Sequence, residues 1–437
     1  MPPDDTLNLL RSGKLHGIHR LDLTADLASL PDEIYDLAET LEILNLSDNQ
    51  LTDLPADLPR LHQLRVIFCA GNRFTRLPEI LGQCPKLEVI GFRSNAIETL
   101  SAAALPPGLR WLILTDNRLG QLPPEIGHCK RLQKLMLAGN LLTELPEEMR
   151  ELKSLELLRL SANRFEALPD FIPTLPRLAW LAFGGNPFSR DGRESVERES
   201  IEWDRLDLHE QLGEGASGRI YRGTWHPEDS PSPRDVAVKL FKGGITSDGL
   251  PEDEIAASVA AGGHPSLISA LGEITGHPDG SSGLVMPLAE DNFQALAGPP
   301  DLKTCTQDVY PKDRHFPFEV AVKIAADIAS AAGHLHARGI LHGDLYAHNI
   351  LWNPQGSCLL GDFGAASMVP AHHAATLEKI EVRAFGHLLG ELLSRIVPET
   401  RHEARVEELL ALKDHCLCPD PQYRPDFQQI ASFFSYL

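Results

Sequence analysis

The chain has 437 residues, a formal net charge of −21 at pH 7, 43% hydrophobic residues and 23% charged residues. This length exceeds a single small domain, and the composition excludes a disordered or fibrous protein. Because the acidic excess repels nucleic-acid phosphates and anionic lipid surfaces, we expect neither nucleic acid nor a membrane as a partner.

The beginning of the chain and its cysteines indicate the compartment. Residues 1–15 contain early acidic residues and no continuous apolar stretch, so no secretory signal is visible. No segment approaches the roughly 18 uninterrupted apolar residues that a membrane helix needs. The seven cysteines lack the paired CxxC spacing of a zinc site. We therefore expect a cytoplasmic protein with reduced thiols, and a secreted effector stays open as an alternative.

A leucine repeat occupies the first part of the chain. The pattern L-x-x-L-x-L-x-x-N-x-L-x-x-L-P recurs every 22 or 23 residues, starting at Leu41, Leu64, Leu87, Leu109, Leu132, Leu155 and, truncated, Leu178. An irregular earlier copy runs through residues 18–31, which gives about eight units. Each L-x-L predicts a short parallel strand whose leucines enter a core shared with the neighbouring repeats, because one repeat cannot bury them alone.

An asparagine recurs once in each repeat. These residues are Asn49, Asn72, Asn95, Asn117, Asn140, Asn163 and Asn186. We interpret them as structural, since their amides can satisfy backbone groups where the chain leaves each strand. With the leucine pattern they make residues 15–188 resemble the leucine-rich-repeat family, which implies an α/β solenoid.

The strand positions between the repeat leucines are unusually apolar. Such positions lie on the concave face of a solenoid, where function usually resides. We expect a protein-binding patch there, centred on Phe68, Trp111, Ile113, Met136 and Trp180. In the alternative interpretation, neighbouring repeats shade these side chains or a second domain covers them.

The repeat ends near residue 188, and the polar segment 189–204 predicts a linker to a second domain over 205–437. There, Gly213, Gly215 and Gly218 have the spacing G-x-G-x-x-G. A dinucleotide site would need a helix directly after these glycines, whereas the next residues are β-like. The pattern favours a glycine hairpin that covers phosphate groups.

Three further motifs follow the glycines. Lys239 ends the segment Val-Ala-Val-Lys, His-Gly-Asp occupies 342–344 with Asn349 five residues beyond the aspartate, and Asp-Phe-Gly occupies 362–364. In order and spacing these motifs resemble the protein-kinase family over residues 205–437. The resemblance implies an α+β domain of two lobes that uses ATP and Mg²⁺. The segment 320–338, with apolar residues at helical spacing, predicts a long helix ahead of the His-Gly-Asp motif.

The resemblance assigns a role to individual residues. The backbone amides of the three glycines would lie over the phosphates, and Lys239 would hold the α- and β-phosphates. Glu254 would fix that lysine, with Glu252 as the alternative. Asp344 would orient the hydroxyl that is phosphorylated.

The remaining contacts to the nucleotide follow from the same resemblance. Asn349 and Asp362 would bind Mg²⁺ through hard oxygen atoms. Met286 would be the gatekeeper, Ala289 would face the adenine through its backbone, and Ala237 would also line the nucleotide site.

The chain departs from the family pattern at several positions. Gly343 stands where an arginine normally pairs with a phosphate on the activation loop, and Tyr346 replaces a lysine. His348 would either touch the γ-phosphate when protonated or be structural. The Ala-Pro-Glu motif of the activation segment is missing. We expect Glu378 or Glu381 to replace its glutamate as the partner of Arg424.

Three hypotheses for function remain from the sequence. The first is a protein kinase, with serine or threonine rather than tyrosine as the expected acceptor, whose repeats recruit a protein partner. In the second, the kinase-like half is a nucleotide-binding or inert scaffold, because the activation segment is short. The third is a small-molecule phosphotransferase, because His-Gly-Asp followed by asparagine also resembles aminoglycoside-type phosphotransferases. The sequence predicts neither the substrate nor the oligomeric state.

Overall fold

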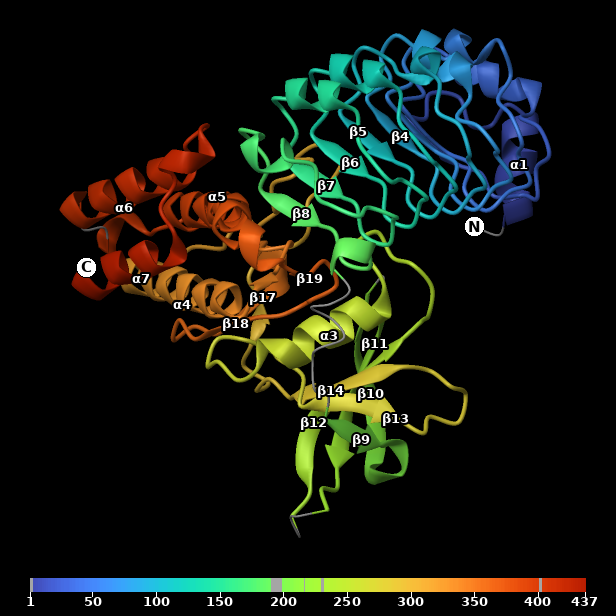
Figure 1. Cartoon of the computed structure of the whole chain (residues 1–437). Helices are drawn as coiled ribbons and strands as arrows, with labels where there is room; N and C mark the ends of the chain where they lie inside the picture. The colour runs from blue at the N-terminus through green and yellow to red at the C-terminus, as the bar shows by residue number, and fades with distance from the viewer. Residues whose placement is uncertain (1–2, 190–198, 216, 229–231, 401–402) are drawn as a thin grey trace. The chain divides into compact units, whose positions relative to one another are not determined.

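The computed structural model describes residues 3–189, 199–215, 217–228, 232–400 and 403–437. Contacts divide the chain into two compact units, Met1–Leu175 and Pro176–Leu437 (Figure 1). Most of the predicted linker, 190–198, lies outside the described residues. The domain limits at 188 and 205 stay predictions.

The first unit is built from the repeats. After the helix α1 (Pro3–Arg11), parallel strands pair in chain order, namely β1 (Arg20–Asp22), β2 (Ile43–Asn45), β3 (Val66–Phe68), β4 (Val89–Gly91), β5 (Trp111–Ile113), β6 (Lys134–Met136) and β7 (Leu157–Arg159). The register joins equivalent positions, such as Ile43 with Val66. The repeat leucines, for example Leu44 and Leu112, are fully buried between neighbouring repeats. The predicted solenoid is confirmed.

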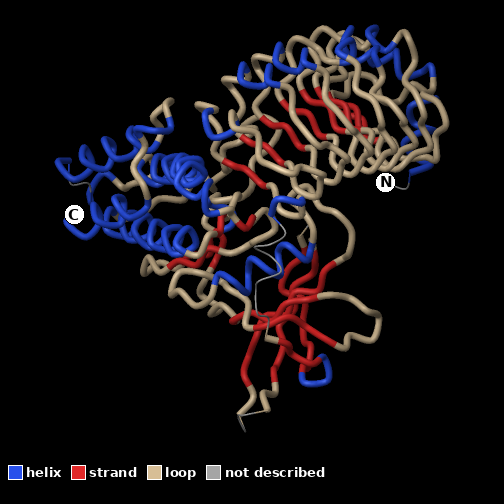
Figure 2. The backbone as a smooth tube through the Cα atoms, viewed as in Figure 1, coloured by secondary structure: helices blue, strands red, loops and turns tan. Residues whose placement is uncertain are grey.

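Short 3₁₀ helices return the chain to the next strand. They are η1 (Asp32–Leu37), η2 (Leu58–Arg60), η3 (Glu79–Gln83), η4 (Ala102–Ala104), η5 (Pro124–His128), η6 (Glu147–Glu151) and η7 (Ile172–Thr174). A proline of a Leu-Pro pair caps several of them, as Pro78 caps η3 and Pro146 caps η6. Within this unit, Figure 2 shows the helical turns along one side and the strands along the other.

The asparagines connect successive repeats, as predicted. Asn49 Oδ1 accepts hydrogen bonds from the backbone N–H groups of Ala25 and Leu27. Its Nδ2 donates to the carbonyl oxygens of Leu23 and Leu46. Each such amide therefore satisfies buried backbone groups of its own repeat and of the repeat before it.

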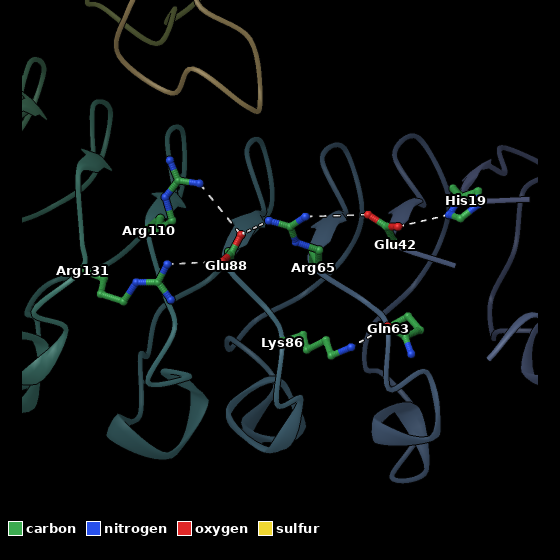
Figure 3. A network of polar contacts seen from close by, with 8 residues as sticks. All are labelled: His19, Glu42, Gln63, Arg65, Lys86, Glu88, Arg110 and Arg131. Atoms are coloured by element: carbon green, nitrogen blue, oxygen red, sulfur yellow. Dashed lines mark hydrogen bonds and ion pairs between the residues drawn. The ribbon is translucent and has the colours of Figure 1, made fainter. Parts of the chain in front are cut away.

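A row of charged side chains precedes the strands of the first unit (Figure 3). Glu42 lies 3.1 Å from His19 and 3.8 Å from Arg65, and Arg65 lies 2.8 Å from Glu88. Glu88 also meets Arg131 at 3.4 Å. Exposed ion pairs contribute about 0–1 kcal/mol each, so the pairs of Glu42 with His19 and Arg65 add little stability to the leucine core, whereas Glu88 is only 17% exposed.

The second unit begins with β8 (Trp180–Ala182) and η8 (Pro187–Ser189). Its larger sheet has the strand order β10-β11-β12-β14-β13-β9. These strands are β9 (Ser200–Glu202), β10 (Leu206–Glu214), β11 (Gly218–Trp225), β12 (Arg234–Phe241), β13 (Gly272–Thr275) and β14 (Gly283–Pro287). The helix α3 (Pro251–Ala261) lies beside this sheet (Figure 1) and packs on it through Ile255, Phe241 and Leu284. This is the first lobe.

The other lobe is mainly helical. Its helices are α4 (Phe318–Ala337), α5 (Ala374–Leu393), α6 (Glu403–Cys416) and α7 (Phe427–Tyr436). Its short strands are β15 (Gln294–Ala295), β16 (Ile340–Leu341), β17 (Ile350–Trp352), β18 (Cys358–Leu360) and β19 (Ser367–Met368). Short 3₁₀ helices complete the unit, namely η9 (Trp203–Arg205), η10 (Ala347–Asn349), η11 (Ala371–His373), η12 (Pro398–Thr400) and η13 (Pro421–Tyr423).

The predicted long helix is confirmed as α4. Its apolar residues Ile324, Ile328 and Leu335 are fully buried. None of the described helices combines the length and the apolar character needed to cross a membrane.

Candidate active site

An ion pair joins the sheet of the first lobe to its helix. Lys239 on β12 binds the carboxylate of Glu254 on α3, and their side chains are only 9% and 4% exposed. Glu252, the alternative partner, is exposed. Burial raises the pKa of Glu254, and the negative charge of Asp362 adds to the rise, while Lys239 opposes it. Both charges are therefore buried, and the loss of either one would leave the other without a compensating charge.

The loop that follows β16 carries Asp344 and Asn349. Asn349 Nδ2 donates to Asp344 Oδ2 and to the Asp344 carbonyl oxygen, both at 2.9 Å. The His342 ring lies within 3.0 Å of the Gly361 carbonyl oxygen through Nε2. Because Gly361 directly precedes Asp362, the His342 contact ties the loop of Asp344 to the chain next to Asp362. We call residues 342–349 the catalytic loop.

Asp362 lies beside the Lys239–Glu254 pair. Its backbone has φ 55° and its side chain is exposed. A Cβ atom built on Gly364 would lie 3.2 Å from Asp362 Oδ1 and 3.6 Å from Glu254 Oε2, so both carboxylates approach this glycine. Phe363 is buried, with its ring centroid 5.3 Å from that of His342.

The glycine pattern forms a hairpin between β10 and β11, as predicted. Gly215 N donates to the Gly218 carbonyl oxygen at 2.9 Å. Among the residues that the structure describes, nothing lies within 4 Å of a Cβ built on Gly213 or Gly215, whereas a Cβ on Gly218 would lie 2.5 Å from the Leu240 carbonyl oxygen. Lys242 Nζ donates to the Gly215 carbonyl oxygen at 2.9 Å. Open backbone at the first two glycines suits close approach of an anionic ligand.

The other predicted nucleotide-lining residues lie on neighbouring strands or just beyond them. Met286 on β14 is paired with Ala237 on β12. Met286 packs against the cluster of Phe241, Ile255 and Leu284 behind α3. Ala289 is half-buried shortly after β14 ends. The nucleotide contacts of Ala237, Met286 and Ala289 stay predictions.

Sequence reasoning missed the role of Glu381 on α5. Its buried carboxylate accepts hydrogen bonds from Gly343 N at 2.8 Å and from His342 N at 3.3 Å. His336 Nε2 lies 2.7 Å from the same carboxylate. Burial alone would raise the pKa of Glu381, but His336, the charge of His342 and the Gly343 N–H outweigh it and lower the pKa. Glu381 thus holds the start of the catalytic loop.

The expected partner of Arg424 was wrong. Its guanidinium donates to three carbonyl oxygens at 2.8 Å, those of Cys418, Lys379 and Pro176. Glu378 instead accepts from Phe427 N at 2.9 Å, and Glu381 serves the catalytic loop. Burial, together with the nearby positive charge of Arg383, lowers the pKa of Arg424 to about 10. Backbone carbonyl oxygens take the place of the expected glutamate carboxylate. A search of the sequence for acidic residues cannot find them.

Asp308 was also missed. It lies in the loop before α4 and binds His348 twice, accepting from His348 N at 3.1 Å and lying 2.7 Å from its Nδ1. The Asp308 side chain is fully buried. Burial lowers the pKa of His348, but Asp308 and the charges of Asp344 and Asp362 outweigh that effect and raise it. No motif surrounds Asp308, so only the fold reveals this pair.

The predicted partner patch separates into two parts. Phe68, Ile113, Trp111 and Met136 are half-buried on β3, β5 and β6. Trp111 Nε1 donates to Met136 Sδ at 3.2 Å. Trp180 is different because it is only 2% exposed. Its ring stacks on that of Tyr346, with centroids 4.2 Å apart. Including Trp180 in an exposed patch was wrong, because its side chain is buried against Tyr346 within the second unit.

Family models match both parts of the chain. Residues 206–385 match the model described as protein tyrosine and serine/threonine kinase. Residues 40–61 and 107–165 match leucine-rich-repeat models. With the solenoid and the site geometry, these matches show leucine-rich repeats followed by a protein kinase domain.

Curated relatives are distant kinases or kinase-like proteins. The chain is 29% identical over 176 residues to serine/threonine-protein kinase mos of Gallus gallus, covering 38% of this chain and 49% of the relative. It is 27% identical over 206 residues to fibroblast growth factor receptor 1 of Pleurodeles waltl, covering 44% and 25%. It is 26% identical over 224 residues to kinase suppressor of Ras 2 of Homo sapiens, covering 46% and 20%. The chain thus spans at most about half the length of these three relatives.

Proposed function

We propose that the chain is a protein kinase that transfers the γ-phosphoryl group of ATP to a serine or threonine hydroxyl of a protein. The observation that supports this best is the pair of contacts Lys239–Glu254 and Asp344–Asn349, with the Asp362 carboxylate close to that of Glu254 and the Gly361 N–H donating to the Asn349 carbonyl oxygen. A structural kinase-like scaffold would not require all five.

The residues fit ATP and Mg²⁺. The Nδ2 group of Asn349 donates a hydrogen bond to Asp344. This bond identifies the other end of the Asn349 amide as Oδ1, an oxygen atom that suits a cation. Asp362 presents an exposed carboxylate, and such hard oxygen atoms are the ligands that Mg²⁺ prefers. When bound, the ion neutralises charge on the phosphate oxygens.

Each side chain then has a part in the transfer. Lys239, oriented by Glu254, binds the α- and β-phosphates, and the open glycine hairpin places backbone N–H groups over them. Asp344 orients the acceptor hydroxyl and takes its proton as the oxygen–phosphorus bond forms. ADP leaves as the bond from its terminal oxygen to the γ-phosphorus breaks.

The repeats would choose the protein that is phosphorylated. Leucine-rich repeats generally mediate protein interactions, and Phe68, Trp111, Ile113 and Met136 form an apolar group on the strands of the first unit. Holding a partner there raises its effective concentration near the kinase domain. In kinases, a full-length activation segment provides a platform for the peptide that is phosphorylated. Recruitment by the repeats would compensate for the shortness of this segment here.

The test is phosphoacceptor mapping by mass spectrometry after incubation of the full chain with Mg-ATP and candidate partners, including sites on the chain itself. Radiolabelled ATP with small alcohols tests a small-molecule acceptor in parallel. Lys239→Met and Asp344→Asn are expected to abolish turnover. Absence of turnover in the folded chain with its partner present would favour the scaffold hypothesis.

A further inference from the structure

Residues 176–189, which we call the last-repeat segment, carry the leucine-repeat pattern but belong to the second compact unit. The segment includes β8 and η8. Its contacts within that unit involve the catalytic loop, the chain after the Asp-Phe-Gly motif and two buried arginines.

The first contact is with the catalytic loop. The rings of Trp180 and Tyr346 stack almost in parallel, at an interplanar angle of 5°. Trp180 Nε1 also donates to the Leu345 carbonyl oxygen at 3.2 Å. Leu345 and Tyr346 directly follow Asp344, so Trp180 restrains both the backbone and a side chain next to the aspartate that would orient the acceptor.

The second contact is with the chain after Asp-Phe-Gly. The hydroxyl oxygen of Ser367 accepts hydrogen bonds from Phe183 N at 3.0 Å and Gly184 N at 3.1 Å. Ser367 lies on β19, which pairs with β16 just before the catalytic loop. The segment therefore contacts β19 directly and is linked to β16 through the pairing of these two strands.

The third contact is with two arginines. Arg424 Nη2 donates to the Pro176 carbonyl oxygen at 2.8 Å. Arg383 Nε donates to the Arg177 carbonyl oxygen at 3.1 Å. Hydrogen bonds to charged groups are stronger than those between neutral groups. The segment thus supplies acceptors where a kinase activation segment would supply a carboxylate.

The segment also explains Gly343. This residue has φ 74°, and a Cβ atom built on it would lie 2.5 Å from the Leu181 carbonyl oxygen and 2.6 Å from that of Ala365. No side chain fits there without movement of the backbone. Three departures from the kinase pattern, at Gly343, Tyr346 and the partner of Arg424, therefore all lie against this segment.

We propose that the last-repeat segment is a built-in part of the catalytic centre that replaces the missing end of the activation segment, with Trp180 as a positioning residue for the catalytic loop. The order of this loop is then set by the fold and needs no phosphate on the activation segment. The catalytic part of the proposal rests on the proposed kinase function, whereas the positioning part does not.

The test compares Trp180→Ala and Trp180→Phe in the full chain, with Tyr423→Ala as a matched control because Tyr423 is an aromatic residue of the same unit with 71% exposure. Hydrogen–deuterium exchange is measured over residues 341–349, and kcat and KM for ATP are measured with any acceptor found. Trp180→Ala is expected to raise exchange in this stretch and to lower kcat about tenfold or more, since small misplacements in an active site are costly. KM for ATP should change by less than about twofold, because Lys239 and the glycine hairpin lie on other elements.

Trp180→Phe keeps an aromatic ring over Tyr346 but removes the hydrogen-bond donor to Leu345. Its exchange over residues 341–349 and its kcat should therefore lie between those of Trp180→Ala and the native chain. Unchanged exchange and unchanged kcat in Trp180→Ala would overturn the proposal. A rise in KM for ATP as large as the fall in kcat would also overturn it, because it would indicate a general loss of order in the kinase domain. If the native chain has no turnover, the kinase function fails, and the exchange data alone decide whether Trp180 positions the loop. If Trp180→Ala does not fold, Ser367→Ala gives the same comparison, with raised exchange over 341–349 expected and unchanged exchange contradicting the proposal.

Discussion

The amide nitrogen of Gly343 donates a hydrogen bond of 2.8 Å to the carboxylate of Glu381. The glycine belongs to the catalytic loop, and the glutamate lies in the middle of α5, fully buried. The same carboxylate accepts from His342 N. A single buried anion thus ties the central helix of the second lobe to the backbone before Asp344.

Glu381→Gln should destabilise the second unit. Glutamine keeps the shape but loses the charge, and one of its terminal atoms is a donor that faces other donors. Hydrogen bonds to charged groups are worth about 1.5–3 kcal/mol each, so we expect a loss of roughly 2–3 kcal/mol. Urea unfolding followed by fluorescence of the second unit measures it. Glu378→Gln, which affects one bond to Phe427 N, is the control, and equal losses in the two variants would contradict this role of Glu381.

The pH dependence of the same residue has a definite sign. The folded-state pKa of Glu381 is below its ordinary value, so its contribution to stability is present above pH about 4.3 and is lost as the pH falls through the lower folded pKa. The native chain should therefore lose stability in acid more steeply than Glu381→Gln. The measurement is the unfolding free energy between pH 3 and 6. The same dependence on pH in the native chain and in Glu381→Gln would argue against this role of Glu381.

Glu391 should act in the opposite direction. Burial and the neighbouring charge of Asp308 raise its pKa to about 8, against the opposing effect of the Tyr310 hydroxyl and Arg395. A raised folded pKa gives stability that is complete below the unfolded pKa and lost as pH rises through 8, at about 1.4 kcal/mol per pKa unit. Glu391→Gln should remove this alkaline loss, and the measurement is the unfolding free energy at pH 6 and 9. If the unfolding free energy of the native chain changes between pH 6 and pH 9 by the same amount as that of Glu391→Gln, the raised pKa of Glu391 is refuted.

The sequence predicted those parts of the fold whose signal is local and periodic. The leucine spacing defined β1 to β7, and the resemblance to protein kinases predicts that Asp344, Asn349 and Asp362 share one site. It also favoured Glu254 over Glu252 correctly, because the second points to solvent. Contacts between segments without a shared pattern were missed. Trp180 and Leu345 lie 165 residues apart, and the acceptors of Arg424 are backbone oxygens that any residue carries.

Gly343→Arg tests whether the family arginine can be restored. We expect a loss of more than about 2 kcal/mol, since a side chain must adopt positive φ and displace the Leu181 and Ala365 carbonyl groups. Melting temperature and soluble yield of the full chain measure it. Gly263→Arg is the control, because no described atom lies within 4 Å of a Cβ built there. A stable Gly343→Arg variant would contradict the close packing of β8 on the catalytic loop.

The buried pair of Lys239 and Glu254 allows stability and activity to be separated. Lys239→Met leaves the Glu254 carboxylate buried without its partner, which costs about 3–5 kcal/mol for such pairs. The double variant Lys239→Met with Glu254→Gln removes both charges, so it should recover most of the unfolding free energy while phosphoryl transfer stays absent. Urea unfolding and radiolabelled phosphate incorporation are measured on the same samples. Transfer activity in the double variant would show that Lys239 does not bind the phosphates, and equal stability of the single and double variants would show that the two charges do not depend on each other.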